Sequence, residues 1–294
     1  MLKSTGTQIT QRLIHKLPVL DIENPHARAV VSLHGAQVLS FQPSGEEKVL
    51  WLSPDSMYRE DQAIRGGIPV CWPWFGKRAE ESPAHGFART ELWRLEQQET
   101  LAGGETRLLL SLHNASHSKW LSQGEQATAN LSLEIIIGSQ LQLTLTTENS
   151  SDQSIEISQA LHTYFAISDI EKISISGLDD MRFLDHLDDK KAYVQKGDVT
   201  FSGEVDRTYL DSTETTIIHD PGMERNVVIK KSGSNSTVVW NPWKVRSKEM
   251  IDMPDEGYKS MVCVESATTP DLPVELEPGA SHKLTARIGV ERAN

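Results

Sequence analysis

Short runs of apolar residues, separated by polar or glycine-containing turns, recur along the whole chain. The clearest pair is residues 129–137 and 141–147, which flank Gly138-Ser139-Gln140. In the second run three leucines alternate with polar residues, which is the period-2 pattern of a half-buried strand. The two runs therefore predict a β-hairpin.

Other apolar runs predict further strands, and residues 29–40 indicate two short strands around Gly35. The remaining predicted strands are 48–52, 107–113, 155–167, 173–175, 237–240, 259–265 and 283–290. Helical patterns are scarce, and only residues 55–64 predict a short helical turn. Strands that follow one another without intervening helices favour antiparallel sheets over βαβ units. We therefore predict an all-β fold, a large antiparallel β-sandwich with few short helices.

The length of 294 residues suits either two ordinary domains or one large all-β domain. No Ser/Gly/Pro-rich stretch is long enough to act as a linker between domains. We therefore expect residues 1–294 to form a single domain with its core at about 29–290.

Charge and cysteine content limit the partners and the compartment. The net charge is −12, which argues against nucleic acid and anionic lipid as partners. The sequence contains no signal-peptide core and no apolar run of membrane-helix length. Its two cysteines, Cys71 and Cys263, lie far apart in the sequence and are expected to be reduced thiols. We expect a cytoplasmic protein without membrane contact.

The segment from Arg65 to Arg89 carries the densest candidate chemistry. Residues 65–76 read RGGIPVCWPWFG and residues 83–89 read PAHGFAR. Glycine and proline impose an unusual backbone path, and arginines are fork-shaped donors for an anion. The tryptophans offer flat faces against which rings can pack. The segment predicts one wall of a binding site for a polar, anionic and cyclic ligand.

Two histidines and one glutamate are candidates for proton transfer. His85 lies beside a glycine in the segment above, and His162 lies in the apolar and aromatic run LHTYF. Burial of His162 can shift its pKa toward the working pH, although a core histidine without a catalytic role fits the same pattern. Glu265 ends an apolar run, where it either caps a surface edge or points into a pocket. Most other histidines, His186 among them, are expected at the surface or in turns.

Further candidates are Asp206, which could bind sugar hydroxyls or pair with Arg207, and three tryptophans in irregular segments. A pocket role is expected for these tryptophans, Trp72, Trp74 and Trp240. No phosphate-binding loop, dinucleotide fingerprint, nucleophile elbow or zinc motif is present. A metal site from His85, His162 and Glu265 is conceivable, but their spacing is not diagnostic.

Taken together, these motifs match a known family in residues 65–70, 72–76, 85–89, 161–165, 206–207, 240–242 and 264–265. This combination resembles the hexose-6-phosphate mutarotases, which are glucose-6-phosphate 1-epimerases of the aldose 1-epimerase superfamily. The resemblance extends over about residues 29–290 and implies a galactose mutarotase-like β-sandwich with a shallow cleft. It implies an isomerase that exchanges the α and β anomers of hexose 6-phosphates without a metal or cofactor, and we expect a monomer.

The resemblance also implies roles for individual residues. His162 would be the general acid, Glu265 the general base and His85 a second active-site histidine. The resemblance assigns Arg65 and Arg89 to the phosphate, and the sugar to Asp206 and Trp240. Some relatives have a glutamine where this chain has Ala84, so that contact is not carried over, and Lys244 is an additional candidate for the phosphate.

Two other functions fit a β-sandwich with these residues. One is a carbohydrate-binding or sugar-sensing protein without turnover, and the other is a metal-dependent isomerase of the cupin type. Mutarotation needs one group that takes a proton from the anomeric hydroxyl and another that gives a proton to the ring oxygen. Because binding alone needs neither, the presence of both His162 and Glu265 favours the enzyme.

Overall fold

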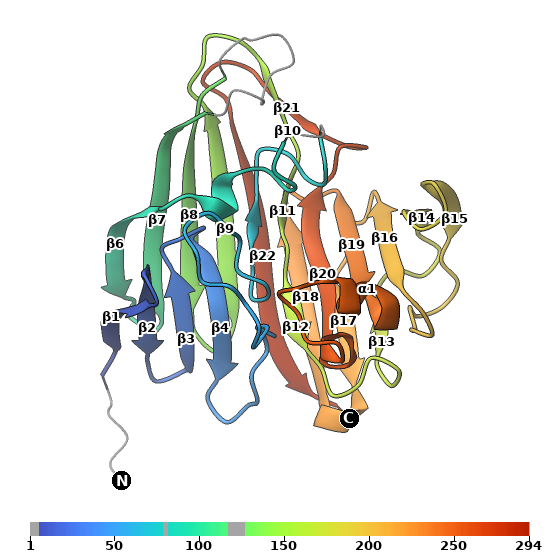
Figure 1. The fold of residues 1–294 in the computed structure, drawn as a ribbon. Coiled ribbons are helices and arrows are strands. Elements are labelled where there is room, and N and C mark those ends of the chain that lie inside the picture. The colour runs from blue at the N-terminus through green and yellow to red at the C-terminus, as the bar shows by residue number, and fades with distance from the viewer. Residues whose placement is uncertain (1–5, 79–81, 117–126, 294) are drawn as a thin grey trace.

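Two eight-stranded antiparallel sheets dominate the computed structural model, which describes residues 6–78, 82–116 and 127–293 (Figure 1). The back sheet contains, in spatial order, β13 (Ser174–Ser176), β17 (Thr216–Asp220), β18 (Arg225–Ser232), β22 (Ser281–Arg292), β9 (Leu141–Asn149), β8 (Ala129–Ile137), β7 (Thr106–Ala115) and β6 (Arg94–Thr100). The cleft sheet contains β15 (Lys191–Val194), β14 (Arg182–Asp185), β16 (Val205–Leu210), β19 (Ser236–Asn241), β20 (Met261–Thr268), β11 (Gln159–Leu161) and β5 (Val70–Cys71), with β12 (Tyr164–Ala166) also paired to β20.

Smaller elements complete the described part of the chain. A four-stranded sheet is formed by β1 (Gln8–Ile14), β2 (Leu17–Glu23), β3 (Ala27–Ser32) and β4 (Gln37–Pro43), and a two-stranded one by β10 (Ile155–Ile157) and β21 (Val274–Leu276). The helical elements are α1 (Trp243–Glu249) and the 3₁₀ turns η1 (Ala88–Thr90), η2 (Pro221–Met223) and η3 (Gly257–Ser260). None of the helices in the described residues is long and apolar enough to cross a membrane.

Alternating burial explains how the two large sheets pack. Every second residue of β8 is fully buried while its neighbours are partly exposed, as expected for a strand with one face on the core. The buried leucines and isoleucines of this strand share one apolar core with Phe165, Val262 and Val264 of the cleft sheet. The predicted all-β antiparallel sandwich with few short helices is therefore confirmed.

Three local predictions were wrong. Residues 48–52 form isolated bridges, such as that from Leu50 to Phe165, and no continuous strand. Residues 55–64 form turns because the hydroxyls of Ser53 and Ser56 bond to nearby backbone groups in place of helical partners. The predicted strand 155–167 is divided into β10, β11 and β12.

Candidate active site

Cross-strand register brings the site residues together in two rows on the face of the cleft sheet that borders the cleft. One row runs Asp206, Trp240, Cys263 and Tyr164 across β16, β19, β20 and β12. The next row, two residues along each strand, runs Thr208, Val238 and Glu265. Because side chains alternate between the two faces of a strand, both rows face the same side.

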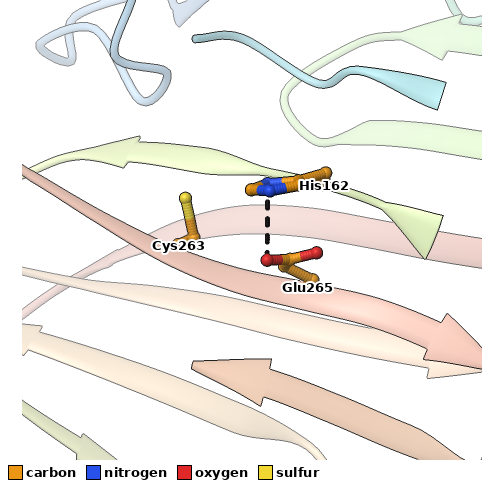
Figure 2. A group of neighbouring side chains, drawn as sticks. All are labelled: His162, Cys263 and Glu265. Carbon is orange, nitrogen blue, oxygen red and sulfur yellow. Dashed lines mark ion pairs between the residues drawn. The ribbon is translucent and has the colours of Figure 1, made fainter. Parts of the chain in front are cut away.

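His162 lies in the short gap between β11 and β12, opposite Glu265. The register is the same on both sides of this gap, where Leu161 pairs with Ser266 and Tyr164 pairs with Cys263, and this sets His162 opposite Glu265. The backbone N–H of His162 donates to the carbonyl of Pro69 at 3.0 Å. His162 Nδ1 lies 3.4 Å from Glu265 Oε1 (Figure 2). The imidazole and the carboxylate thus form a close pair on neighbouring strands.

Burial controls the charge of this pair. The side chains of His162 and Glu265 are 10% and 1% exposed, and neither His162 Nδ1 nor Glu265 Oε2 has a hydrogen-bond partner among the described residues. Burial, reinforced by Asp206, raises the pKa of Glu265 well above its ordinary value. Burial also lowers the pKa of His162 well below its ordinary value, with further contributions from His85, Arg89 and Arg65. Burial therefore favours a protonated glutamate and a neutral histidine, in contrast to the pKa near the working pH that the sequence predicted for His162.

His85 is presented to the cleft by a backbone turn that only glycine permits at the next position. Gly86 has φ of 70°, and a Cβ there would lie 1.9 Å from the carbonyl oxygen of Trp72. The N–H of Gly76 donates to His85 Nδ1 at 3.3 Å, so the neutral ring carries its proton on Nε2. Burial lowers the pKa of His85 to about 3, with smaller contributions from Arg89 and Arg65. His85 is therefore a neutral hydrogen-bond donor.

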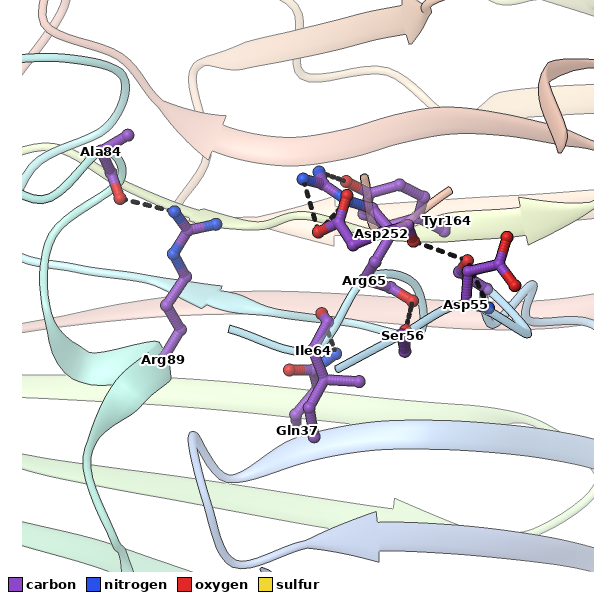
Figure 3. A network of polar contacts seen from close by, with 10 residues as sticks. Gln37, Asp55, Ser56, Ile64, Arg65, Ala84, Arg89, Tyr164 and Asp252 are labelled. Carbon is purple, nitrogen blue, oxygen red and sulfur yellow. Dashed lines mark hydrogen bonds and ion pairs between the residues drawn. The ribbon is translucent and has the colours of Figure 1, made fainter. Parts of the chain in front are cut away.

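Arg65 is fixed in position by two other side chains. Its guanidinium donates to Asp252 Oδ2 from Nε at 3.1 Å and to the hydroxyl of Tyr164 from Nη1 at 2.9 Å (Figure 3). The backbone beside it is held by Gln37, whose amide donates to the carbonyl of Gly66 at 2.6 Å. Arg65 Nη2 also lies 3.0 Å from Asp252 Oδ2. All three guanidinium nitrogens thus contact Asp252 or Tyr164, while the second N–H groups of Nη1 and Nη2 remain for a ligand.

Arg89 is the middle residue of η1. Within the described residues it makes one side-chain hydrogen bond, from Nη2 to the carbonyl of Ala84 at 2.6 Å. Both Arg65 and Arg89 line the cleft. The strand order β16–β19–β20–β11–β5 places Asp206 on one side of the His162–Glu265 pair and the Arg65 segment on the other. The cleft therefore has a basic end and an acidic end.

The acidic end is built around Asp206 of β16, and Arg246 of α1 adds a positive charge that acts on its carboxyl. Asp206 is partly buried, and burial together with the neighbouring Asp185 raises the pKa of its carboxyl. It does not pair with Arg207, which lies over the ring of Phe183 at 4.7 Å. Trp240 stands beside Asp206 on the adjacent strand, with its ring 6.3 Å from that of His162.

Seven of the sequence-predicted site residues line a single cleft of about 740 Å³: Arg65, His85, Arg89, His162, Asp206, Trp240 and Glu265. Two tryptophans predicted for the pocket do not, because Trp72 and Trp74 are 0% and 3% exposed and belong to the main core. Lys244 does not line the cleft and lies over Trp243 instead.

Sequence reasoning missed several contributors to the site. His186, expected at the surface or in a turn, lines the cleft and contacts Thr208 Oγ1 at 2.9 Å through Nε2. Arg246 and Glu249 of α1 also line the cleft, and no helix was predicted there. Only Tyr164 carried a signal, because it belongs to the same aromatic run as His162.

One group of side chains in the described residues has the composition of a metal site. One ligand atom each from His162, Cys263 and Glu265 lies within 4.8 Å of the other two, and all three residues are buried. This differs from the His85, His162 and Glu265 set considered from the sequence. The two cysteines, Cys71 and Cys263, are both free and buried.

Comparison with known proteins supplies a family for this fold. A family model described as Aldose 1-epimerase matches residues 18–289. A relative from Escherichia coli (strain K12) is 38% identical over 261 residues, which cover 88% of this chain and 86% of that protein. A relative from Salmonella typhimurium is 34% identical over 275 residues, covering 92% and 90%. Both carry the name "Putative glucose-6-phosphate 1-epimerase".

Solved structures agree with this match. The crystal structure of "a putative mutarotase (YeaD)" from Salmonella typhimurium has a TM-score of 0.88 at 32% identity, covering 97% of this chain and 94% of that one. A galactose 1-epimerase from Lactobacillus acidophilus has a TM-score of 0.71 at 13% identity, covering 99% and 100%, which shows a shared fold. The predicted galactose mutarotase-like sandwich is therefore confirmed.

Proposed function

This chain belongs to the aldose 1-epimerase family, and we propose that it interconverts the α and β anomers of D-glucose 6-phosphate by opening and reclosing the sugar ring. Other hexose 6-phosphates are candidate substrates of the same chemistry. The proposal rests on one observation above all. A buried histidine–glutamate pair, with Nδ1 and Oε1 3.4 Å apart, lies between a basic and an acidic end of one cleft.

The reaction needs two proton transfers and no change in oxidation state. Glu265 takes the proton of the anomeric hydroxyl while His162 gives a proton to the ring oxygen, and the bond between the anomeric carbon and the ring oxygen breaks. Rotation about the C1–C2 bond of the resulting aldehyde presents its other face. The reverse transfers close the ring as the other anomer. Each such group typically contributes about 10²–10⁴ in rate.

A single proton shared by the pair is enough for this cycle. Ring opening starts with an ionised Glu265 and a protonated His162, and it ends with a protonated Glu265 and a neutral His162. Burial favours the protonated Glu265 and the neutral His162, since it raises the pKa of the carboxyl and lowers that of the imidazole. The surroundings of the pair therefore favour the open-chain intermediate over a charged resting pair.

His85 supports the sugar without exchanging a proton. Its Nδ1 accepts from the Gly76 N–H, which leaves the Nε2 proton for the ring oxygen or a neighbouring hydroxyl. A fixed donor of this kind stabilises negative charge that develops on oxygen during ring opening.

The basic end of the cleft suits the phosphate. Arg65 and Arg89 approach from two segments, and arginine forks bind phosphate oxygens through charge-assisted, often bidentate hydrogen bonds. Asp252 and Tyr164 hold the Arg65 fork in place before the ligand arrives, so less conformational freedom is lost on binding.

The acidic end suits the sugar hydroxyls. Asp206 lies two strands from Glu265, roughly 10 Å at the usual strand spacing of about 4.8 Å, which leaves room for a sugar ring between the side chains. Its carboxyl can accept hydrogen bonds from the sugar hydroxyls, and the ring of Trp240 offers an apolar face for the sugar.

Anomer exchange measured by two-dimensional exchange NMR on glucose 6-phosphate tests the proposal. Wild-type protein should speed the exchange above the spontaneous rate, and His162→Ala or Glu265→Ala should abolish the increase. Binding of glucose 6-phosphate without faster exchange would instead identify a carbohydrate-binding or sugar-sensing protein. Near-normal exchange in both variants would contradict the assigned acid–base pair.

We also propose that the chain acts as a cytoplasmic, single-domain monomer. Support for one domain comes from the main apolar core, which contains residues from Leu20 to Ile288. A hexose phosphate is a metabolite of the cell interior, where Cys71 and Cys263 would remain reduced.

A further inference from the structure

Cys263 stands beside the proposed acid–base pair but has no part in the proton transfers. It lies two residues before Glu265 on β20 and therefore on the same face of the sheet. Figure 2 shows its sulfur on the same side of β20 as the imidazole and the carboxylate. Its side chain is fully buried and does not line the cleft.

Two buried polar atoms of this group lack a hydrogen-bond partner in the described residues. These are Nδ1 of His162 and Oε2 of Glu265. Buried polar atoms without partners are rare in folded proteins, and each calls for an explanation. A cation bound by nitrogen, oxygen and sulfur ligands would give Nδ1 of His162 a partner.

We propose that His162, Cys263 and Glu265 form a binding site for a thiophilic divalent cation such as Zn²⁺, and that metal bound there inhibits the enzyme. A tetrahedral zinc ion with nitrogen and oxygen ligands at about 2.0–2.1 Å holds those two atoms roughly 3.4 Å apart. The distance between His162 Nδ1 and Glu265 Oε1 is 3.4 Å. The pair is thus already spaced as two zinc ligands.

The sulfur completes the set after a small movement. The three ligand atoms lie within 4.8 Å of one another, whereas zinc at about 2.3 Å from sulfur needs a separation of roughly 3.6 Å from the other ligands. A side-chain shift on the order of 1 Å therefore closes the set. His162 and Glu265 line the cleft, so water from the cleft can take the fourth position.

Charge balance favours a divalent ion over a monovalent one. Binding releases the thiol proton and the proton of the pair to solvent, because metal ligands must be deprotonated. The resulting thiolate and carboxylate carry two negative charges, which cancel those of the ion. A thiolate ligand selects zinc, cadmium or cobalt over magnesium and calcium, which prefer oxygen.

Bound metal would block anomer exchange because it occupies both groups that move the protons. Glu265 could no longer accept the anomeric proton, and His162 could no longer hold one. This inhibition rests on the proposed function, whereas metal binding itself does not. The two are therefore measured separately.

The chain offers a matched control for Cys263. Cys71 is equally buried, and it packs against the apolar side chains of Ala160, Val238 and Ala267. It is not among the three ligands. Cys71→Ala therefore removes a buried thiol of the cleft sheet that is not one of the three proposed ligands.

Direct binding is measured with Co²⁺, without sugar, on wild type, Cys263→Ala, Cys263→Ser and Cys71→Ala. Wild type and Cys71→Ala should show thiolate-to-cobalt charge-transfer absorption that saturates at one ion per chain. Both Cys263 variants should lack it while retaining the wild-type circular dichroism spectrum. If wild type shows no such absorption, or if it persists in the Cys263 variants, the site is wrong whatever the enzyme does.

Inhibition is measured with buffered Zn²⁺ in the NMR exchange assay. Without metal, the Cys263 variants should exchange anomers at the wild-type rate. With metal, wild type and Cys71→Ala should lose activity, and a chelator should restore it. The Cys263 variants should need at least tenfold more Zn²⁺ for the same loss, and equal sensitivity in all four proteins would overturn the inhibitory role.

Discussion

Replacing Glu265 with glutamine tests whether the buried pair holds one proton. The carboxyl is 1% exposed, its Oε2 has no hydrogen-bond partner in the described residues, and burial with Asp206 raises its pKa. Glutamine keeps the shape but cannot take up the anomeric proton. We expect kcat to fall by about 10²–10⁴, which is roughly 2.7–5.4 kcal/mol of transition-state free energy.

The same substitution should raise stability, and the sign follows from proton counting. Native Glu265 keeps its proton, whereas an unfolded glutamate loses it above about pH 4.3. The native state then binds one proton more than the unfolded state, so its free energy of unfolding falls by roughly 1.4 kcal/mol per pH unit while the native carboxyl stays protonated. Glutamine removes this loss, so the variant should gain stability over wild type as the pH rises from 5 to 7, by about 2.7 kcal/mol where the native carboxyl stays protonated over the whole range.

Urea unfolding at pH 5 and pH 7 measures this gain, and exchange NMR measures the loss of activity. Glu60→Gln is the control, because Glu60 is exposed and its substitution should leave both quantities unchanged. If Glu265→Gln and wild type differ by the same free energy at both pH values, Glu265 adds no proton to the native state over this range and the description of a protonated carboxyl is wrong. Wild-type kcat in the variant would remove Glu265 from the mechanism.

Two other predictions concern the basic end and the backbone that supports it. Arg65→Met and Arg89→Met should each raise KM for glucose 6-phosphate by about 10–100-fold, since a charged hydrogen bond contributes about 1.5–3 kcal/mol. The control is KM for free glucose, which should not change. An unchanged KM for glucose 6-phosphate would refute the phosphate assignment. Gly86→Ala should lower both Tm and activity because its Cβ would lie 1.9 Å from the Trp72 oxygen. Gly45→Ala is the control, because Gly45 also has a positive φ of 85° but no atom lies within 4 Å of an added Cβ. Its Tm should fall only by the cost of placing alanine at a positive φ. Equal Tm losses in the two variants would show that contact with the Trp72 oxygen does not matter at Gly86.

Local pattern was enough to predict the layers of this fold. The alternating leucines of β9 and the glycine turn before it are properties of adjacent residues, and the hairpin they form is confirmed. Patterns failed where the backbone bonds to distant partners. The apolar residues 48–52 resemble a strand, yet Leu50 and Leu52 each make one isolated bridge, to Phe165 and Gly66. The segment changes partner after Leu50, so neither pairing is long enough to form a continuous strand.

Residue types predicted which side chains line the cleft, but cross-strand register decides how they meet. Nothing near His162 in the sequence indicates that Glu265 lies opposite it, or that Cys263 stands one row away. The tryptophans show the converse error. The sequence predicted a pocket role for both Trp72 and Trp240 because both lie in irregular segments. Trp72 is buried in the core, and only Trp240 lines the cleft.

The position of the pair's proton should depend on the phosphate. Burial lowers the pKa of His162, and the positive charges of Arg89 and Arg65 lower it further. A phosphate dianion bound by both arginines cancels part of that charge, so the pKa of His162 should rise and its protonated form should become easier to reach. The catalytic acid would then gain its proton only in the presence of a phosphorylated ligand.

Two unreactive ligands separate this effect from sugar binding. 1,5-Anhydroglucitol 6-phosphate lacks the anomeric hydroxyl, and 1,5-anhydroglucitol lacks the phosphate as well. The ¹⁵N shifts of His162, followed against pH, should titrate at higher pH with the first ligand than with the second. Identical titrations with saturating amounts of both would show that Arg65 and Arg89 do not couple phosphate binding to proton transfer, and discrimination against free sugars would then have to arise from binding alone.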